Sequence, residues 1–195
     1  MGVTAVILAG GRATRMQGEK PLRLLRGRTL LEHSRRIVAH VADEVLVSSG
    51  ARDLPVPYAV PDAPEFAGRG PLAGILAGLE AAKHEHTLVL ACDLPNVPPP
   101  LLRRLLEALS DNCDCVYTQH SGNPEPLVVA LTTAPARAGV RKALSMGVNK
   151  VLPCWDALPH RVLGEDDLAK FRPLDRTFAN VNTLEDLEQE MERDA

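Results

Sequence analysis

Val3-Thr-Ala-Val-Ile-Leu8 runs directly into Ala9-Gly-Gly-Arg-Ala-Thr-Arg-Met-Gln-Gly-Glu-Lys20 at the start of this chain. The first six residues are apolar or β-branched, which is typical of a buried strand. The loop that follows combines glycines with Arg12, Arg15 and Lys20, and glycine lets a backbone approach a ligand closely. We therefore predict a strand that presents a cationic loop to an anionic ligand at the edge of a sheet. A surface turn with incidental arginines is the alternative.

The composition bounds the class of protein. The 195 residues, 45% of them hydrophobic, suffice for one sizeable core, so we predict a single domain over 1–195. A net charge of −3 and 3% aromatic residues disfavour nucleic acid as a partner. No stretch approaches the roughly 20 apolar residues of a membrane helix, and no signal-peptide pattern is present. We predict a cytoplasmic protein without a membrane partner.

The cysteines and histidines show no catalytic or metal-binding spacing. Cys92, Cys113, Cys115 and Cys154 lack zinc-site spacing and are interpreted as buried, reduced thiols. The six histidines are scattered along the chain, and we interpret them as surface or structural residues.

Strand and helix patterns alternate through the first 110 residues, which indicates a parallel α/β sheet with right-handed crossovers. Strands are predicted at 3–8, 44–49, 57–61 and 87–92, and helices at 29–40, 70–83 and 98–109. Further strands are predicted at 113–118, 127–131 and 178–182, and a helix at 133–146. The polar link at 119–124 suits either a hairpin or a long return between two of these strands. Thr183 and Asp186 have the spacing of a capping pair, so a last helix is expected there. Residues 148–173 follow no clear pattern.

Three glycines mark one face of the helix predicted at 70–83. Gly70, Gly74 and Gly78 recur every fourth residue, and Pro71 suits the first helical position. Each interior glycine costs about 1 kcal/mol relative to alanine. This smooth face indicates the close approach of either a neighbouring strand or a bulky ligand, and the pattern leaves both open.

Polar residues follow several of the predicted strands. Asp62 and Asp93 each come directly after one, and Asn180 with Asn182 come near the end of the chain. Ligands of open parallel sheets bind beyond the carboxyl ends of the strands, and residues i and i+2 of an extended segment face the same side. We therefore expect these groups and the glycine loop to converge on one cleft. A role as helix cap or turn residue is the alternative for Asp93.

The loop does not match the two commonest phosphate-binding motifs. Gly10 and Gly11 are adjacent, so the Gly-x-Gly-x-x-Gly fingerprint is absent, and Lys20 lacks the Gly-Lys-Ser/Thr context of a P-loop. A Rossmann dehydrogenase and a Walker ATPase are both disfavoured.

Several segments together resemble the molybdenum cofactor guanylyltransferase family. They are Leu8-Ala-Gly-Gly11, Arg15-Met16, Gly18, Lys20, Gly70-Pro-Leu-Ala-Gly74, Asp93 and Phe178-Ala-Asn-Val-Asn-Thr183. The resemblance spans almost the whole chain. It implies a Rossmann-like α/β three-layer sandwich with a mostly parallel central sheet, similar to nucleotide-diphospho-sugar transferases. It also implies transfer of GMP from GTP to (molybdenum-)molybdopterin with Mg²⁺, giving the guanine dinucleotide cofactor and pyrophosphate.

The same resemblance implies roles for individual residues on the nucleotide side. The backbone of the glycine loop would hold GTP, Lys20 would reach its phosphates, and Ser48 stands near where the family has an asparagine. Residues 1–110 would form the GTP-binding half. The implied catalytic residues are Arg15, Lys20 and Asp93. The implied nucleotide-binding residues are Leu8, Ala9, Gly10, Gly11, Lys20, Ser48, Asp62, Gly74 and Asp93.

On the other side of the cleft, residues 111–195 would form the molybdopterin-binding half. The resemblance implies Asp93 and Asn182 as metal ligands for Mg²⁺. Asn180 and Asn182 match paired asparagines near the metal and the pterin. The link from Gln119 to Pro126, and Asn149 with Lys150, are further candidates for the pterin site, with ordinary loop residues as the alternative. Transient contact with molybdoenzymes or their chaperones is also expected.

Other functions remain open. A cytidylyl or sugar-phosphate nucleotidyltransferase would share the fold, and a non-catalytic nucleotide- or cofactor-binding protein is a further alternative. Leu-Ala-Gly-Gly resembles the guanylyl type and Leu-Ala-Ala-Gly the cytidylyl type, so Gly10 favours GTP.

Overall fold

The computed structural model describes residues 2–10, 20–50 and 54–193. Its centre is a seven-stranded sheet in the order β5-β4-β1-β6-β8-β7-β9. The strands are β1 (Val3–Leu8), β4 (Glu44–Gly50), β5 (Ala59–Pro61), β6 (His86–Ala91), β7 (Cys115–His120), β8 (Asn123–Thr132) and β9 (His160–Leu163). Only β8 runs antiparallel to its neighbours in this sheet. This mostly parallel α/β architecture confirms the predicted fold class.

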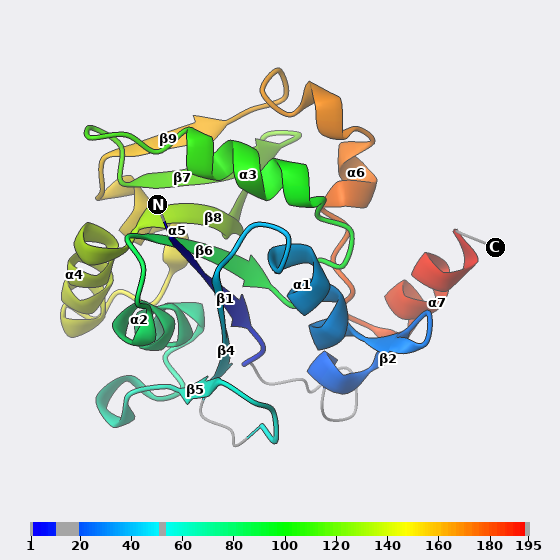
Figure 1. The fold of residues 1–195 in the computed structure, drawn as a ribbon, viewed down its shortest axis with the longest axis horizontal. Helices are drawn as coiled ribbons and strands as arrows, with labels where there is room; N and C mark the ends of the chain where they lie inside the picture. Colours follow the sequence, from blue (N-terminus) through cyan, green and yellow to red (C-terminus); the bar gives the residue numbers. More distant parts are fainter. Residues whose placement is uncertain (1, 11–19, 51–53, 194–195) are drawn as a thin grey trace.

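Helices cover both faces of the sheet, which gives the three-layer arrangement seen in Figure 1. On one face, α1 (Leu30–Val38) and α3 (Pro99–Glu107) pack against the central strands. On the other face lie α2 (Pro71–Ala81), α4 (Thr133–Ser145) and α5 (Val151–Asp156). All six residues of β1 are buried, as expected for a central strand covered on both sides.

Short elements complete the chain. They are η2 (Lys20–Leu22), β2 (Leu24–Leu25), β3 (Arg28–Thr29), η3 (Pro64–Phe66), η4 (Ala169–Phe171), α6 (Leu174–Thr177) and α7 (Leu184–Glu192). Among the described residues, no helix is long and apolar enough to cross a membrane. All four cysteines are free and buried, as predicted, and burial raises the pKa of Cys154 to about 11.

The glycine face of α2 serves helix–strand packing. A Cβ atom added at Gly78 would overlap the side chain of Val6 on β1, and one added at Gly74 would overlap Ser48 on β4. Of the two alternatives, the close approach of strands therefore explains these two glycines. Pro71 occupies the first helical position, as predicted.

One prediction from the sequence is wrong. The strand expected at 178–182 is absent from these described residues; they cross the end of β6, where Val181 N–H donates to Asp93 C=O at 2.9 Å. Both neighbours of β6 are already β1 and β8, so no position beside it is left. Of the two outcomes expected for the polar link at 119–124, the structure has the hairpin: β7 and β8 meet at a tight turn of Ser121 and Gly122, both with positive φ.

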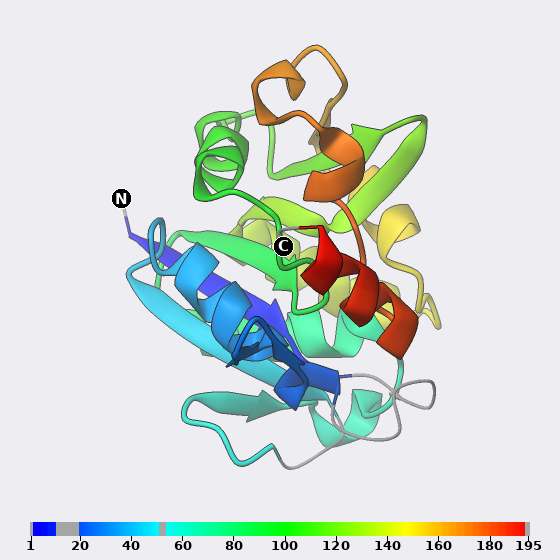
Figure 2. The same ribbon diagram turned by 90° about the vertical axis from the view of Figure 1, so that its right-hand side faces the viewer.

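The last helix was predicted correctly because its start signal is local. Thr183 Oγ1 accepts from the Asp186 backbone N–H, and the Asp186 carboxylate accepts from the Thr183 N–H. Helix α7 then packs beside β2, at the opposite end of the sequence, as Figures 1 and 2 show.

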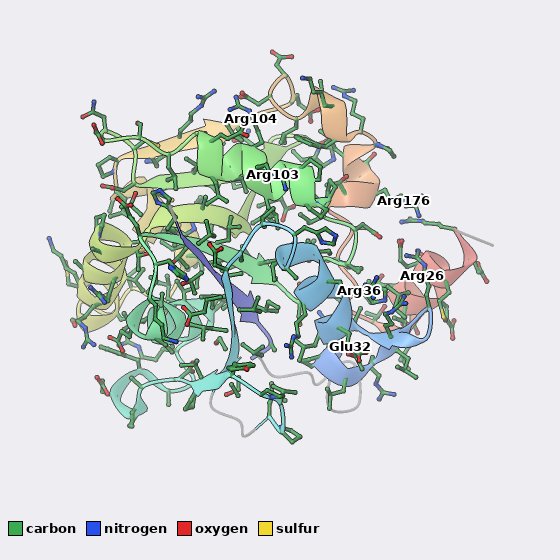
Figure 3. All side chains as sticks on the ribbon, viewed as in Figure 1. Arg26, Glu32, Arg36, Arg103, Arg104 and Arg176 are labelled. Carbon is green, nitrogen blue, oxygen red and sulfur yellow. The ribbon has the colours of Figure 1, made fainter. Side chains whose placement is uncertain are left out.

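An ion-pair cluster reinforces this contact between the two ends of the chain. Glu190 on α7 is buried and accepts from Arg26 at 2.9 Å, from Arg193 at 3.1 Å and from the Asn96 side chain at 2.9 Å. Figure 3 labels Arg26 next to α7. The cluster thus fixes α7, and the residues just before it, against the loop after β6.

Candidate active site

A cavity of about 680 Å³ lies beyond the carboxyl ends of β1, β4 and β6. It is lined by predicted nucleotide-binding residues from six separate parts of the chain: Leu8, Ala9, Gly10, Lys20, Ser48, Asp62, Gly74 and Asp93. Gly11 and Arg15, also predicted for this site, lie outside the described residues. The convergence expected from strand-end positions is present for the nucleotide side of the site.

Lys20, Asp93 and Asn182 form the polar centre at the mouth of this cavity. The Lys20 ammonium donates to Asp93 Oδ2 and to Asn182 Oδ1, both at 2.8 Å. The Lys20 and Asp93 side chains are 16% and 21% exposed, so a ligand in the cavity can reach both. Helix α3 begins after Pro98, which rules out the alternative that Asp93 caps it.

Local contacts hold these three residues in place. The Asp186 carboxylate accepts from the Asn182 backbone N–H at 2.8 Å, which orients the residue before α7. Lys20 opens the 3-10 turn η2, and the hairpin after it packs Leu25 against Val181 and Leu187. The position of Lys20 relative to Asn182 is therefore set by a small apolar cluster behind the site.

Asp62 provides an unpartnered acceptor inside the cavity. Its residue is buried, and Oδ2 accepts only a long bond of 3.3 Å from the Gly68 N–H. The other oxygen, Oδ1, has no partner among the described residues. Burial raises the pKa of this carboxyl, although the Gly68 N–H opposes the shift. A buried oxygen without a partner is costly, so this position suits a ligand that donates a hydrogen bond.

Gly10 lies where two strand ends come close together. A Cβ atom at this position would lie 2.9 Å from both N and Cα of Gly50, at the end of β4. Gly50 C=O in turn accepts from the Asp62 N–H at 3.0 Å. A side chain at position 10 would therefore push on Gly50, and Gly50 holds the backbone of Asp62 through this hydrogen bond.

The residues predicted for the pterin site are not gathered in the cavity. Asn149 is not among the residues that line it, and its Oδ1 accepts from Arg69 Nε at 2.9 Å. Lys150 is exposed at the start of α5, and Asn180 is exposed as well. Asn182 alone of the four reaches the polar centre. The Arg69–Asn149 contact was not predicted because its partners are 80 positions apart.

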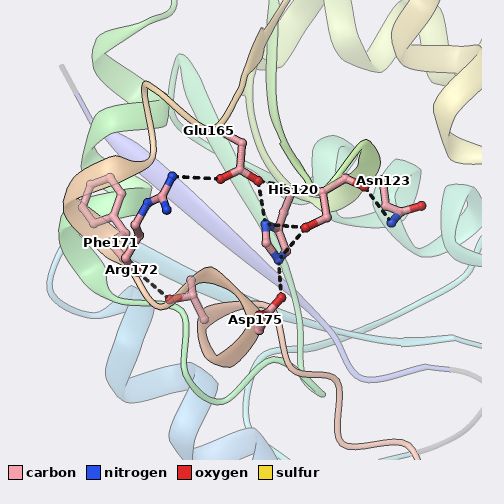
Figure 4. A network of polar contacts seen from close by, with 8 residues as sticks. His120, Asn123, Glu165, Phe171, Arg172 and Asp175 are labelled. Carbon is pink, nitrogen blue, oxygen red and sulfur yellow. Dashed lines mark hydrogen bonds and ion pairs between the residues drawn. The ribbon is translucent and has the colours of Figure 1, made fainter.

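A second polar cluster lies on the β7–β8 hairpin and escaped the sequence analysis. His120 Nδ1 lies 3.0 Å from Glu165 Oε1, and Nε2 lies 2.7 Å from Asp175 Oδ1, as drawn in Figure 4. The hydrogen bond to Asp175, followed by that to Glu165, raises the pKa of His120. Both ring nitrogens face carboxylates, so the doubly protonated ring is the form that satisfies them.

Comparisons with known proteins place this geometry in a family. Residues 5–157 match the model of the MobA-like NTP transferase domain. A probable molybdenum cofactor guanylyltransferase of Pelotomaculum thermopropionicum is 31% identical, over 94% of this chain and 89% of its own. The molybdenum cofactor guanylyltransferase of Burkholderia vietnamiensis is 36% identical, over 95% and 93%.

Solved structures agree with these relatives. Molybdopterin-guanine dinucleotide biosynthesis protein A of Archaeoglobus fulgidus superposes with a TM-score of 0.80 at 25% identity, covering 97% of both chains. A 2-C-methyl-D-erythritol 4-phosphate cytidylyltransferase of Thermus thermophilus has a TM-score of 0.70 at 22% identity, covering 99% and 98%. The second likeness shows the shared fold only.

Proposed function

Because this chain belongs to the molybdenum cofactor guanylyltransferase family of MobA-like NTP transferases, we propose that its cavity binds GTP and transfers GMP to molybdopterin. The chain is an enzyme of the nucleotidyltransferase class. The observation that carries the proposed reaction is the convergence of Lys20, Asp93 and Asn182 at the mouth of the cavity. That arrangement places one cation and two oxygen ligands where a triphosphate would lie.

The nucleotide occupies the half of the cleft built by residues 1–110. The triphosphate lies against the backbone of Gly10 and is neutralised by Lys20, with Arg15 as a further cation; the Ala9 N–H already donates to Ser48 C=O. Backbone N–H groups and a lysine ammonium are suited to phosphate oxygens because they donate without accepting. The base then extends toward Asp62, on the β4–β5 side of the cavity.

Two features support guanine as the base. Guanine presents a ring N–H beside an amino group, and a carboxylate accepts such a pair of parallel donors well. Asp62 offers a buried oxygen without a described partner for that purpose. Gly10 supports the same choice, because a methyl group there would displace Gly50, which holds the Asp62 backbone.

The donors present fit Mg²⁺. Asp93 and Asn182 supply a carboxylate and an amide oxygen, and both already converge on the positive charge of Lys20. Mg²⁺ takes oxygen ligands and is commonly held by one or two protein groups, the rest being phosphates and water. This agrees with the finding that no three potential metal-ligating residues cluster among those described. When bound, the ion would supply neutralisation of charge on the phosphates.

The reaction requires positioning and charge neutralisation rather than a general base. A phosphate oxygen of molybdopterin forms a bond to the α-phosphorus of GTP, and the bond from that phosphorus to the β-phosphate oxygen breaks, releasing pyrophosphate. A phosphomonoester has a second pKa of about 6, so the nucleophile is already largely dianionic at neutral pH. Lys20 offsets negative charge on the triphosphate as the two substrates approach.

Molybdopterin occupies the half built by residues 111–195, beyond Asp93. Asn182, at the polar centre, contacts both substrates, and the exposed residues Asn180, Asn149 and Lys150 are further candidates for contacts with the pterin. Contact with molybdoenzymes or their chaperones stays a prediction, as does the cytoplasmic location.

The experiment that tests this proposal measures pyrophosphate release by the purified chain with Mg²⁺ and molybdopterin, comparing GTP, CTP and ATP. We expect release with GTP at a kcat/KM well above that for the other two nucleotides. A higher value for CTP would overturn the base assignment alone. If no nucleotide supports release, the proposed reaction is wrong.

A further inference from the structure

Glu125 lies beside the cleft, near Asp93 and two residues before Leu127, which lines the cavity. It stands near the start of β8 and pairs across the hairpin with Thr118, so both side chains project from one face. Strand β8 runs antiparallel to β6, which brings its beginning toward the end of β6 and Asp93. Glu125 is therefore close to the reacting centre on the side assigned to the second substrate.

The Glu125 carboxyl has no hydrogen-bond partner in the described part of the chain. The residue is half-buried, and burial, reinforced by the charge of Asp93, raises its pKa, while His120 opposes the shift. Across the hairpin, the buried Thr118 hydroxyl also has no partner among the described residues. The Glu125 oxygens are thus left to interact with a molecule other than this chain, whereas the Thr118 hydroxyl is fully buried.

His120 is the one described group whose positive charge lowers the pKa of Glu125, and it is already engaged. Its two ring nitrogens face Glu165 and Asp175, and its ring stacks on Phe178 with centroids 5.9 Å apart. Figure 4 shows the ring directed toward these two carboxylates. His120 therefore fixes the hairpin against the segment before α7 and leaves the Glu125 oxygens available.

The hydrogen-bonding chemistry of an ionised carboxyl limits which ligands Glu125 can bind. It accepts hydrogen bonds and pairs best with two parallel N–H donors. Of the substrates, the pterin carries a ring N–H beside an amino group on its amino-pyrimidinone edge. Guanine has a similar edge, but Asp62 takes it on the opposite side of Asp93.

We infer that Glu125 binds the amino-pyrimidinone edge of the pterin in the second substrate and so helps to select molybdopterin, an inference that rests on the proposed function. The site then uses one carboxyl for each heterocycle: Asp62 for guanine and Glu125 for the pterin. The reacting phosphates lie between them, at Lys20, Asp93 and Asn182.

The test measures binding of two fluorescent probes to the full chain. We would compare 6-hydroxymethylpterin with 6-hydroxymethyllumazine, which has a carbonyl in place of the amino group, in wild type and Glu125→Gln. Wild type should bind the pterin about tenfold or more tightly than the lumazine, as expected for a hydrogen bond to a charged group. Glu125→Gln should lose most of that preference. Glu107→Gln, an exposed carboxyl at the end of α3, is the matched control and should retain it.

Kinetics separate this inference from the proposed reaction. In Glu125→Gln, we expect the KM for molybdopterin to rise about tenfold or more, with an unchanged KM for GTP and an unchanged Tm. Equal preference for the pterin probe in wild type and Glu125→Gln would overturn the inference. So would a variant whose only change is that the reaction requires a higher Mg²⁺ concentration. The two results can also disagree. If the pterin preference depends on Glu125 but the wild-type protein releases no pyrophosphate with any nucleotide, the proposed reaction is wrong and the pterin contact is still supported.

Discussion

Lys20 is the residue through which the two sides of the site meet. It is 73 positions from Asp93 and 162 from Asn182, yet its ammonium contacts both. Those two contacts concentrate positive charge where the α-phosphate would react. They also occupy the oxygens that fit Mg²⁺, so Lys20 must exchange part of its bonding from protein to phosphate when substrate and metal bind. Substitutions at these three residues should therefore affect catalysis more than folding.

Asp93→Asn should separate these contributions. The substitution keeps the shape of the side chain but removes its charge, so we expect kcat/KM to fall by at least about 100-fold. Because the Lys20–Asp93 pair is partly exposed, the free energy of unfolding should change by no more than about 1 kcal/mol. Pyrophosphate release and a circular-dichroism melt measure the two effects. Asp111→Asn, an exposed carboxyl after α3, is the control; a collapsed fold in Asp93→Asn would indicate a structural role instead.

Gly10→Ala should alter the choice of base. The added methyl group would press on the Gly50 backbone, which must move, and Asp62 is hydrogen-bonded to that residue. We expect the ratio of kcat/KM for GTP to that for CTP to fall by about tenfold, the range typical of one altered pocket contact. An equal loss with both nucleotides would show that Gly10 acts on the phosphates alone. Steady-state kinetics with the two nucleotides decide between these outcomes.

At the scale of elements, the sequence predicted what local signals control. Thr183 and Asp186 cap α7 within four residues, and β1 is recognisable from its own apolar run. The position of Asp93 after a strand sufficed to place it at the cleft. By contrast, residues 178–182 cannot form a strand beside β6 because β1 and β8 already flank it, and the sequence does not show this. The hydrogen bond from Arg69 to Asn149 joins two loops that are distant in the sequence, so it could not be predicted either. The link from Gln119 to Pro126 was a candidate for the pterin site, but Glu125 was not singled out within it, because the strand pairing that aligns Glu125 with Thr118 cannot be read from the sequence of the hairpin.

The contact between the β7–β8 hairpin and the segment before α7 should depend on pH. Asp175, then Glu165, raise the pKa of folded His120, while Glu125 and the Arg172 that pairs with Glu165 also lie near. A raised pKa means that the contact stabilises the fold fully below the unfolded value of about 6.5 and loses this effect as pH rises through the folded value.

His120→Gln tests that dependence. At pH 5.5, we expect its Tm to lie about 1–3 °C below that of wild type, as for other exposed ion pairs in a protein of this size. The difference should shrink by pH 9, where the wild-type ring is neutral. A difference that is constant or larger at pH 9 would contradict an ionic contact. Thermal melts of both proteins at the two pH values suffice. The control is His40→Gln, which replaces an exposed histidine just after α1.

The site as a whole draws on the entire length of the molecule. Its walls come from β1, η2, β4, the loop after β5, α2, β6 and the residues before α7. The Glu190 cluster and the apolar contact of Leu25 with Val181 and Leu187 hold the last of these parts in place. A ligand that contacts Lys20, Asp93 and Asn182 at once therefore connects the beginning, middle and end of the chain, and its binding should stabilise all three together.

Thermal stability in the presence of nucleotide measures that connection. With Mg²⁺ and GTP at a hundred times its Kd, ligand binding should add about 2.7 kcal/mol to the free energy of unfolding. For a chain of this length, that corresponds to a rise in Tm of about 5–10 °C. CTP at the same concentration should raise Tm less, and Asp62→Asn should reduce the rise with GTP because the base loses its acceptor. Hydrogen exchange under the same conditions should slow at the end of β1, after β6 and at the start of α7 alike. Protection confined to the first two would mean that GTP does not engage Asn182, and that this residue serves the second substrate alone.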